Sequence, residues 1–167
     1  MHSRWIPGLA AVGAGVVGLL LWPFFPALEL VDGSNGRVVF CARVQPGEEF
    51  VLSFVHSVNR RPVYDTLRAE GDHLVIVKSR FDSFGAGMPE SSTSEGTLAV
   101  AADGWLEWTM NRAVPEVTVR VGRVADHTLS IKGKEIRLSE LVEPGVALTL
   151  RARKFRMLDL MKGRCMP

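Results

Sequence analysis

The stretch EFVLSFVHSVNRRPVYDTLRAEGDHLVIVKSRFD, residues 49–82, decides the fold class of this chain. Apolar and polar side chains alternate in three runs, which are residues 49–57, 62–70 and 73–82. A period of two residues is typical of strands with one buried face. Ser, Asn and Pro occupy the first connection, and Glu70-Gly71 occupies the second, as tight turns require. The stretch therefore predicts three consecutive antiparallel strands.

The same pattern continues on both sides of this stretch. Further runs rich in Val, Phe, Thr and Leu are predicted strands: residues 27–32, 37–44, 97–101, 104–110, 116–122, 126–131, 134–138 and 146–154. Turn pairs that end in glycine separate many of them. Strands spaced by about 8–12 residues predict an all-β domain, either an antiparallel β-sandwich or a barrel-like fold. Only Leu138–Val142, with Ser139 as a cap, and residues 154–162 suggest short helices.

Composition fits a folded globular domain and argues against several functional classes. Of the 167 residues, 47% are apolar and 23% are charged, which argues against general disorder. The formal net charge of +2 gives no reason to expect nucleic acid as a partner. Neither a CxxC nor an HExxH motif is present, so we expect no metal site and no cofactor.

The two cysteines, Cys41 and Cys165, leave two interpretations open. In an oxidising compartment they would pair as a disulfide. Alternatively, Cys41 is a small buried residue, because it lies inside a predicted strand and free cysteine is often buried.

The N-terminal segment WIPGLAAVGAGVVGLLLWPFFPAL, residues 5–28, contains no charged residue. About 20 apolar residues are enough for a helix that spans a bilayer. We therefore predict an uncleaved transmembrane anchor over residues 1–28 and an extracytoplasmic β domain over residues 29–167. Arg4, before the apolar segment, predicts that the N-terminus lies in the cytoplasm.

Pro23 and Pro26 are predicted to end this transmembrane helix, because proline interrupts helical hydrogen bonding. A cleaved signal peptide and a buried core helix are the alternatives. Signal peptides have a shorter apolar core and small residues before the cleavage site, and Phe25-Pro26-Ala27-Leu28 fits that pattern poorly.

The connection that follows residue 55 carries the densest polar cluster of the chain, from His56 to Asp65. A serine hydrolase would need Ser57 as nucleophile, His56 as base and Asp65 as orienting acid. Adjacent residues of a strand point to opposite faces, and no GxSxG motif is present, so we expect no catalytic residue and no enzymatic activity. For His56, a local hydrogen bond at the edge of the core and a ligand contact both remain open.

Residues 83–96 form a second candidate, a long segment rich in Gly and Ser. Gly85 and Gly87 permit positive φ, so the segment is able to present successive backbone N–H groups to an anion. Arg60 or Arg80 would then add a guanidinium for a carboxylate. The alternative is a tight turn whose apolar side chains, from Phe81, Phe84 and Met88, close the end of the domain.

The two motifs resemble those of a bacterial family of small, membrane-anchored domains of unknown function. They read F-x-H-S-V-x-R-x-P-V-x-D from Phe54 to Asp65 and F-x-S-F-G-A-G-M-P-E from Phe81 to Glu90. Genes of this family commonly lie beside TAXI-type TRAP transporters, which import organic acids and amino acids with an extracytoplasmic binding protein.

This resemblance implies a single-pass protein of the bacterial inner membrane with a periplasmic domain. It implies an accessory or regulatory protein of such a transporter, in contact with the membrane subunit or with the extracytoplasmic binding protein. A periplasmic domain that binds or senses a small carboxylate is the alternative, followed by an enzyme acting on the imported metabolite. The expected ligand- or partner-binding residues are His56, Ser57, Asn59, Arg60, Asp65, Arg80, Phe84, Gly85, Gly87, Met88 and Pro89.

Hairpin topology predicts that the two motifs lie side by side. Because paired antiparallel strands run in opposite directions, Phe81 is expected beside Val63. Asp65 is expected to pair with Arg80 across the two strands.

Overall fold

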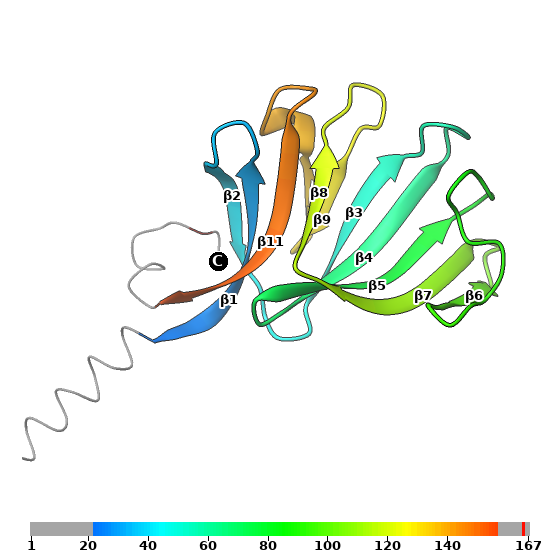
Figure 1. Cartoon of the computed structure of the whole chain (residues 1–167), viewed down its shortest axis with the longest axis horizontal. Coiled ribbons are helices and arrows are strands. Elements are labelled where there is room, and N and C mark those ends of the chain that lie inside the picture. The colour runs from blue at the N-terminus through cyan, green and yellow to red at the C-terminus, as the bar shows by residue number, and fades with distance from the viewer. Residues whose placement is uncertain (1–21, 157–164, 166–167) are drawn as a thin grey trace, which may run out of the picture.

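Eleven strands form two antiparallel sheets in the computed structural model, which describes residues 22–156 and Cys165 (Figure 1). The four-stranded sheet has the order β2-β1-β11-β8, with β1 (Pro23–Asp32), β2 (Val38–Arg43), β8 (Glu116–Arg120) and β11 (Ala147–Arg156). The seven-stranded sheet has the order β10-β9-β3-β4-β5-β7-β6. Its strands are β3 (Glu49–Val55), β4 (Pro62–Glu70), β5 (His73–Phe81), β6 (Thr97–Val100), β7 (Leu106–Val114), β9 (Thr128–Ile131) and β10 (Lys134–Arg137). The prediction of an all-β antiparallel domain is confirmed.

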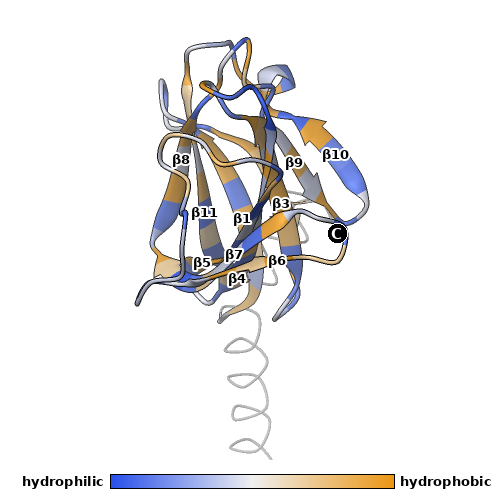
Figure 2. Ribbon diagram, turned by 90° about the vertical axis from the view of Figure 1, so that its right-hand side faces the viewer, coloured by the Kyte–Doolittle hydropathy of each residue, from blue (hydrophilic) through white to orange (hydrophobic). Residues whose placement is uncertain are grey.

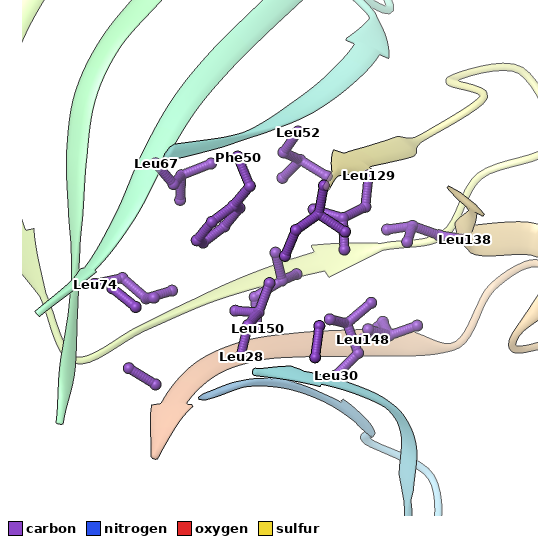
Figure 3. Close-up of a cluster of buried hydrophobic side chains, with 14 of the residues drawn as sticks. Leu28, Leu30, Phe50, Leu52, Leu67, Leu74, Leu129, Leu138, Leu148 and Leu150 are labelled. Atoms are coloured by element: carbon purple, nitrogen blue, oxygen red, sulfur yellow. The ribbon is translucent and has the colours of Figure 1, made fainter. Parts of the chain in front are cut away.

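The two sheets meet in one apolar core between their inner faces (Figure 3). Alternation along the strands, visible as changing colours in Figure 2, directs Leu28 and Leu30 of β1 toward Phe50 and Leu52 of β3. All four side chains are buried. Removing each such side chain from water stabilises the fold by about 1.5–3 kcal/mol.

A second, smaller apolar cluster lies on the inner face of the seven-stranded sheet. Its buried members are Val63, Phe81 and Trp108, and none of the described residues in it belongs to the four-stranded sheet. Met88 packs against this cluster from the connection between β5 and β6. Gly96, from the same connection, lies so close that a Cβ atom there would be 2.7 Å from the Trp108 ring. This connection therefore covers apolar surface that the four-stranded sheet does not reach.

β1 begins at Pro23, four residues before the strand that we predicted over residues 27–32. Ala27 and Leu28 are 0% exposed, so the end of the apolar segment belongs to the core of the domain. Pro23 and Pro26 are tolerated because β1 pairs there only with β11, and pairing with β2 starts at Ala27. A lipid environment and a protein core both exclude water. The run of apolar residues therefore continues without a break from the predicted membrane segment into β1.

Within the described residues, no helix is long and apolar enough to cross a membrane. The predicted transmembrane helix lies largely on residues 1–21, which are outside the description. The other two predicted helices differ from the structure. Leu138–Glu140 form one 3₁₀ turn without a side-chain cap from Ser139, and the start of 154–162 continues β11 to Arg156, because pairing with β1 extends that far.

Cys41 and Cys165 form a disulfide with a Cα–Cα distance of 4.6 Å, which answers the question left open by the sequence. The bond joins β2 to a residue near the C-terminus across a sequence separation of 124 residues. Closing so long a loop restricts the unfolded chain, and the disulfide thereby stabilises the fold.

Truncation of Leu28 tests whether this part of the apolar segment belongs to the β domain. We expect Leu28→Ala to lower the free energy of unfolding by about 2–5 kcal/mol, because it leaves a cavity in the core. Val38→Ala, at a neighbouring-strand position that is 46% exposed, serves as the control and should change stability by less than about 0.5 kcal/mol. Denaturant unfolding of the full chain in mild detergent gives both values. Equal and small effects would contradict the placement of Leu28.

Candidate functional site

Three connections meet at one end of the domain, which we call the apical end. They are residues 56–61 between β3 and β4, residues 82–96 between β5 and β6, and residues 121–127 between β8 and β9. The Val55 N–H donates a hydrogen bond to the Ala125 carbonyl at 2.7 Å. The Asn59 side-chain amide donates to Ser83 Oγ at 3.2 Å and to the Phe84 carbonyl at 3.4 Å. Connections far apart in the sequence are thus held together by direct contacts.

The connection over residues 56–61 is a closed turn. The His56 N–H donates to the Arg61 carbonyl at 2.8 Å, and the Arg60 N–H donates to the His56 carbonyl at 2.9 Å. Arg60 has φ +54°, which directs the chain sharply back. His56 Nδ1 accepts a hydrogen bond from the Val58 N–H at 3.3 Å. The local hydrogen bond considered for His56 is therefore present, with Nδ1 as its acceptor.

The connection after β5 packs directly against this turn. Arg61 pairs with Asp82 through two guanidinium nitrogens, and the distance from its Nε to Asp82 Oδ1 is 3.0 Å. A Cβ atom at Gly85 would lie 2.8 Å from Asn59 Nδ2, so a larger residue here would displace the Asn59 side chain. Gly87 has φ +84°, a conformation that also favours glycine.

Part of the backbone in the connection between β5 and β6 is already hydrogen-bonded within that connection. The Met88 N–H donates to the Gly85 carbonyl at 2.9 Å and closes a turn, and Pro89 follows with no N–H group. These two positions therefore offer no N–H group to an anion, and the proposed anion-binding loop is smaller than the sequence suggested.

The predicted adjacency of the two motifs is confirmed, because Val63 is paired with Phe81. Most of the expected site residues lie at the apical end: His56, Ser57, Asn59, Arg60, Phe84, Gly85, Gly87, Met88 and Pro89. Asp65 and Arg80 lie within strands instead. The predicted Asp65–Arg80 pair is wrong, because Asp65 is opposite Ser79 and Arg80 is opposite Tyr64. Neighbouring positions on a strand face opposite sides, so the two side chains point away from each other.

Arg80 belongs to a charged cluster on the outer face of the seven-stranded sheet. Its Nη2 lies 2.6 Å from Asp103 Oδ2, and its Nε lies 3.2 Å from Glu107 Oε1. Its guanidinium carbon is 5.3 Å from the centre of the Trp105 ring. The hydrogen bond from Arg80 lowers the pKa of Asp103. Because Asp103 and Glu107 already offset the positive charge of Arg80, this side chain is poorly suited to bind a small carboxylate.

Asp65 lies on the inner face of the same sheet, between Val63 and Leu67 along β4. It therefore separates the two apolar clusters. One carboxylate oxygen accepts a hydrogen bond from Ser79 Oγ at 2.5 Å. Burial raises the pKa of Asp65, and the Ser79 hydrogen bond offsets part of that increase. Sequence reasoning missed Ser79, although the predicted pairing of Val63 with Phe81 already places Ser79 opposite Asp65.

Three large apolar side chains are exposed at the apical end, one on each connection. Val58 is 67% exposed, Phe84 is 50% exposed and Val124 is 76% exposed. We call these three residues the apical patch. The Phe84 ring lies 6.3 Å from the buried Phe81 ring in an edge-on arrangement, which anchors it. Val124 was missed because residues 122–127 belong to neither motif, although a large apolar residue in a polar turn was a visible signal.

The chemistry of the apical end does not indicate a metal centre. Among residues 22–156 and Cys165, no group of His, Cys, Asp and Glu side chains is arranged to hold a metal ion. His127 stacks on Phe54 with ring centres 5.7 Å apart, and burial lowers the pKa of His127.

Comparison with known proteins gives one match. A family described as Domain of unknown function (DUF1850) matches residues 50–138, more than half of the 167-residue chain. The chain belongs to this family. The match includes both motifs and extends from Phe50 of β3 past the end of β10, so the DUF1850 region contains all of the seven-stranded sheet except Glu49. No curated protein and no solved structure matches the chain.

The buried carboxyl group gives a pH-dependent test. Because burial raises the pKa of Asp65, ionisation destabilises the folded state above the ordinary pKa of about 3.9. Asp65→Asn keeps an oxygen for Ser79 and removes the charge. We expect this variant to melt at a higher temperature than the wild type at neutral pH. The difference should shrink as the pH falls through the raised pKa of Asp65.

Asp103→Asn is the matched control, because Arg80 lowers the pKa of Asp103. Here the wild type should be the more stable protein at neutral pH, and its advantage should disappear on acidification. The exposed position of Asp103 makes this effect small. Thermal melts over a pH series measure both differences, and the same sign for the two variants would contradict our account of Asp65.

Proposed function

We propose that this protein is a membrane-anchored, extracytoplasmic accessory or regulatory protein that binds another protein through the apical patch. The observation that carries this proposal is the exposure of Val58, Phe84 and Val124 on three connections that hydrogen bonds hold together. The motifs resemble those of proteins encoded beside TAXI-type TRAP transporters. A transporter of that type is therefore the partner that we propose.

The apical patch has the properties of a protein-binding surface. Protein interfaces concentrate their affinity in a few large apolar or aromatic side chains with polar groups around them. Phe84 supplies such a side chain, and its contact with Phe81 restricts its motion before binding. Because the surrounding turns are already closed, little conformational entropy remains to be lost when a partner binds.

A small-carboxylate site has less support in the same region. Arg61 is paired with Asp82, and Arg80 is paired with Asp103 and Glu107. Arg60 is exposed, and its side chain has no hydrogen-bond or ion-pair partner among the described residues. Arg123, beside Val124, is likewise exposed and without such a partner among the described residues. Exposed cations beside apolar side chains suit the rim of a protein interface better than an enclosed carboxylate pocket.

The disulfide supports an extracytoplasmic location. Disulfides persist in oxidising compartments, including the bacterial periplasm, and are rare in the reducing cytosol. Residues 5–22 contain no charged residue and are still long enough for a spanning helix after Pro23 is assigned to β1. Together these features favour a membrane anchor followed by a periplasmic domain.

Truncation of the apical patch tests the protein-binding function. We expect Phe84→Ala to weaken binding to the TAXI transporter by about tenfold or more, because central aromatic residues dominate interface energies. The melting temperature should change little, since the ring is half exposed. Val38→Ser, an exposed position on β2, is the matched control and should bind like the wild type.

Binding would be measured between the purified full chain and the transporter of the same organism in mild detergent, and substrate uptake would be followed in complemented deletion cells. Unchanged binding and uptake for both variants would refute the proposed function.

Thiol trapping in intact cells tests the location. If the domain is periplasmic, Cys41 and Cys165 should be unreactive toward a maleimide until a reductant is added. Cys165→Ser should leave Cys41 unpaired, so that denatured samples of this variant react without reduction. Two reactive thiols in the untreated wild type would contradict an oxidising location.

A further inference from the structure

The end of the domain opposite the apical patch contains a hollow of about 400 Å³. We call this the basal end. Its walls come from the start of β1, from the two turns β2–β3 and β4–β5, and from β11, namely Phe24, Pro26, Pro46, Gly47, Ala69, Glu70, Gly71 and Lys154. The Val44 N–H donates to the Pro26 carbonyl at 3.0 Å and fixes the β2–β3 turn beside β1. The chain therefore enters the domain at the basal end.

Aromatic side chains are exposed at this point of entry. Trp22 is 63% exposed and Phe24 is 56% exposed, and their rings are 6.3 Å apart. Tryptophan is enriched at the level of lipid headgroups, where its ring is partly in the apolar layer. Residues 5–22 carry no charge, and the first strand residue is Pro23, so the sequence leaves no polar linker between the two parts. One residue extends the chain by at most about 3.6 Å. With the anchor that we propose, the basal end must lie at the bilayer surface.

The strands of the seven-stranded sheet separate this surface from the apical patch. β3, β4 and β5 each connect a basal turn with an apical connection. β4 runs from Pro62 at the apical end to Glu70 at the basal hollow. At about 3.3 Å per residue, a strand of this length covers roughly 25 Å. Figure 1 shows that β3, β4 and β5 lead away from the start of β1.

We infer that the apical patch meets its partner about 25 Å from the bilayer surface, at the far end of these strands. The partner is a water-soluble extracytoplasmic protein, and not a membrane-embedded subunit. This inference rests on the proposed function and selects one of its two possible partners. The partner surface must provide an apolar socket for Phe84 and acidic side chains near Arg60 and Arg123, whose charges are unpaired among the described residues.

Photo-crosslinking distinguishes the two partners. A benzophenone amino acid would replace either Val58, at the apical patch, or Asp72, which is exposed in the basal β4–β5 turn. Both full-length proteins would be illuminated in membranes that contain the complete TAXI transporter. We expect position 58 to crosslink to the soluble binding protein, and position 72 not to do so. Adding Phe84→Ala should reduce the yield from position 58 about tenfold.

The outcomes separate this inference from the proposed function. A crosslink from position 58 to the membrane subunit would overturn the inference and leave the accessory function intact. No crosslink from position 58 to any transporter component, with no effect of Phe84→Ala on uptake, would refute the proposed function itself.

Energy transfer measures how the β domain is oriented on the membrane. Val58→Cys or Asp72→Cys would be labelled with a fluorophore in the full chain, since Cys41 and Cys165 are paired and do not react. Energy transfer to acceptor-labelled headgroups in lipid nanodiscs should be strong from position 72 and weak from position 58. Equal transfer from both positions would mean that the domain lies on its side, and would overturn the inference.

Discussion

The apolar inner face of the seven-stranded sheet must be covered, and the four-stranded sheet covers only part of it. Val63, Phe81 and Trp108 lie on the remaining part, where no second sheet packs. The connection between β5 and β6 takes that place, with Met88 against the cluster and Gly96 against the Trp108 ring. Leaving such side chains in water would cost about 1.5–3 kcal/mol each. The position of the second sequence motif is therefore a consequence of core burial.

The geometry of the apical end follows from this placement. Once the β5–β6 connection is packed, Gly85 lies close to Asn59, and the two motifs form one surface. Phe84 lies edge-on beside the buried Phe81 ring, and half of Phe84 remains exposed. The surface that we propose for binding is thus the outer side of the segment that completes the core.

Charge pairing decides which side chains at the two motifs are available to a partner. Arg61 and Arg80 each have acidic neighbours, whereas Arg60, in a left-handed backbone conformation, extends from the turn. Asp65 is directed inward and is partnered by Ser79. Of the charged residues in the two motifs, Arg60 and Glu90 are both exposed and without an ion-pair partner in the described part of the chain. Arg123, beside Val124 in the connection over residues 121–127, is also exposed and without an ion-pair partner in this part of the structure. Two cations beside three exposed apolar side chains are therefore characteristic of the apical end.

The sequence by itself determined the strands, their order along the chain and the adjacency of the two motifs. These features depend on local pattern: alternation of period two assigns a strand, and a short turn forces its neighbours to pair antiparallel. Only the tertiary structure decided that β1 starts at Pro23, because an apolar run looks the same before a bilayer and before a protein core. The same holds for the Cys41–Cys165 disulfide. The opposite faces of Asp65 and Arg80, by contrast, already follow from the predicted pairing of Val63 with Phe81. Val124 joins the apical patch through a hydrogen bond between Val55 and Ala125, a contact across the chain that no local pattern encodes.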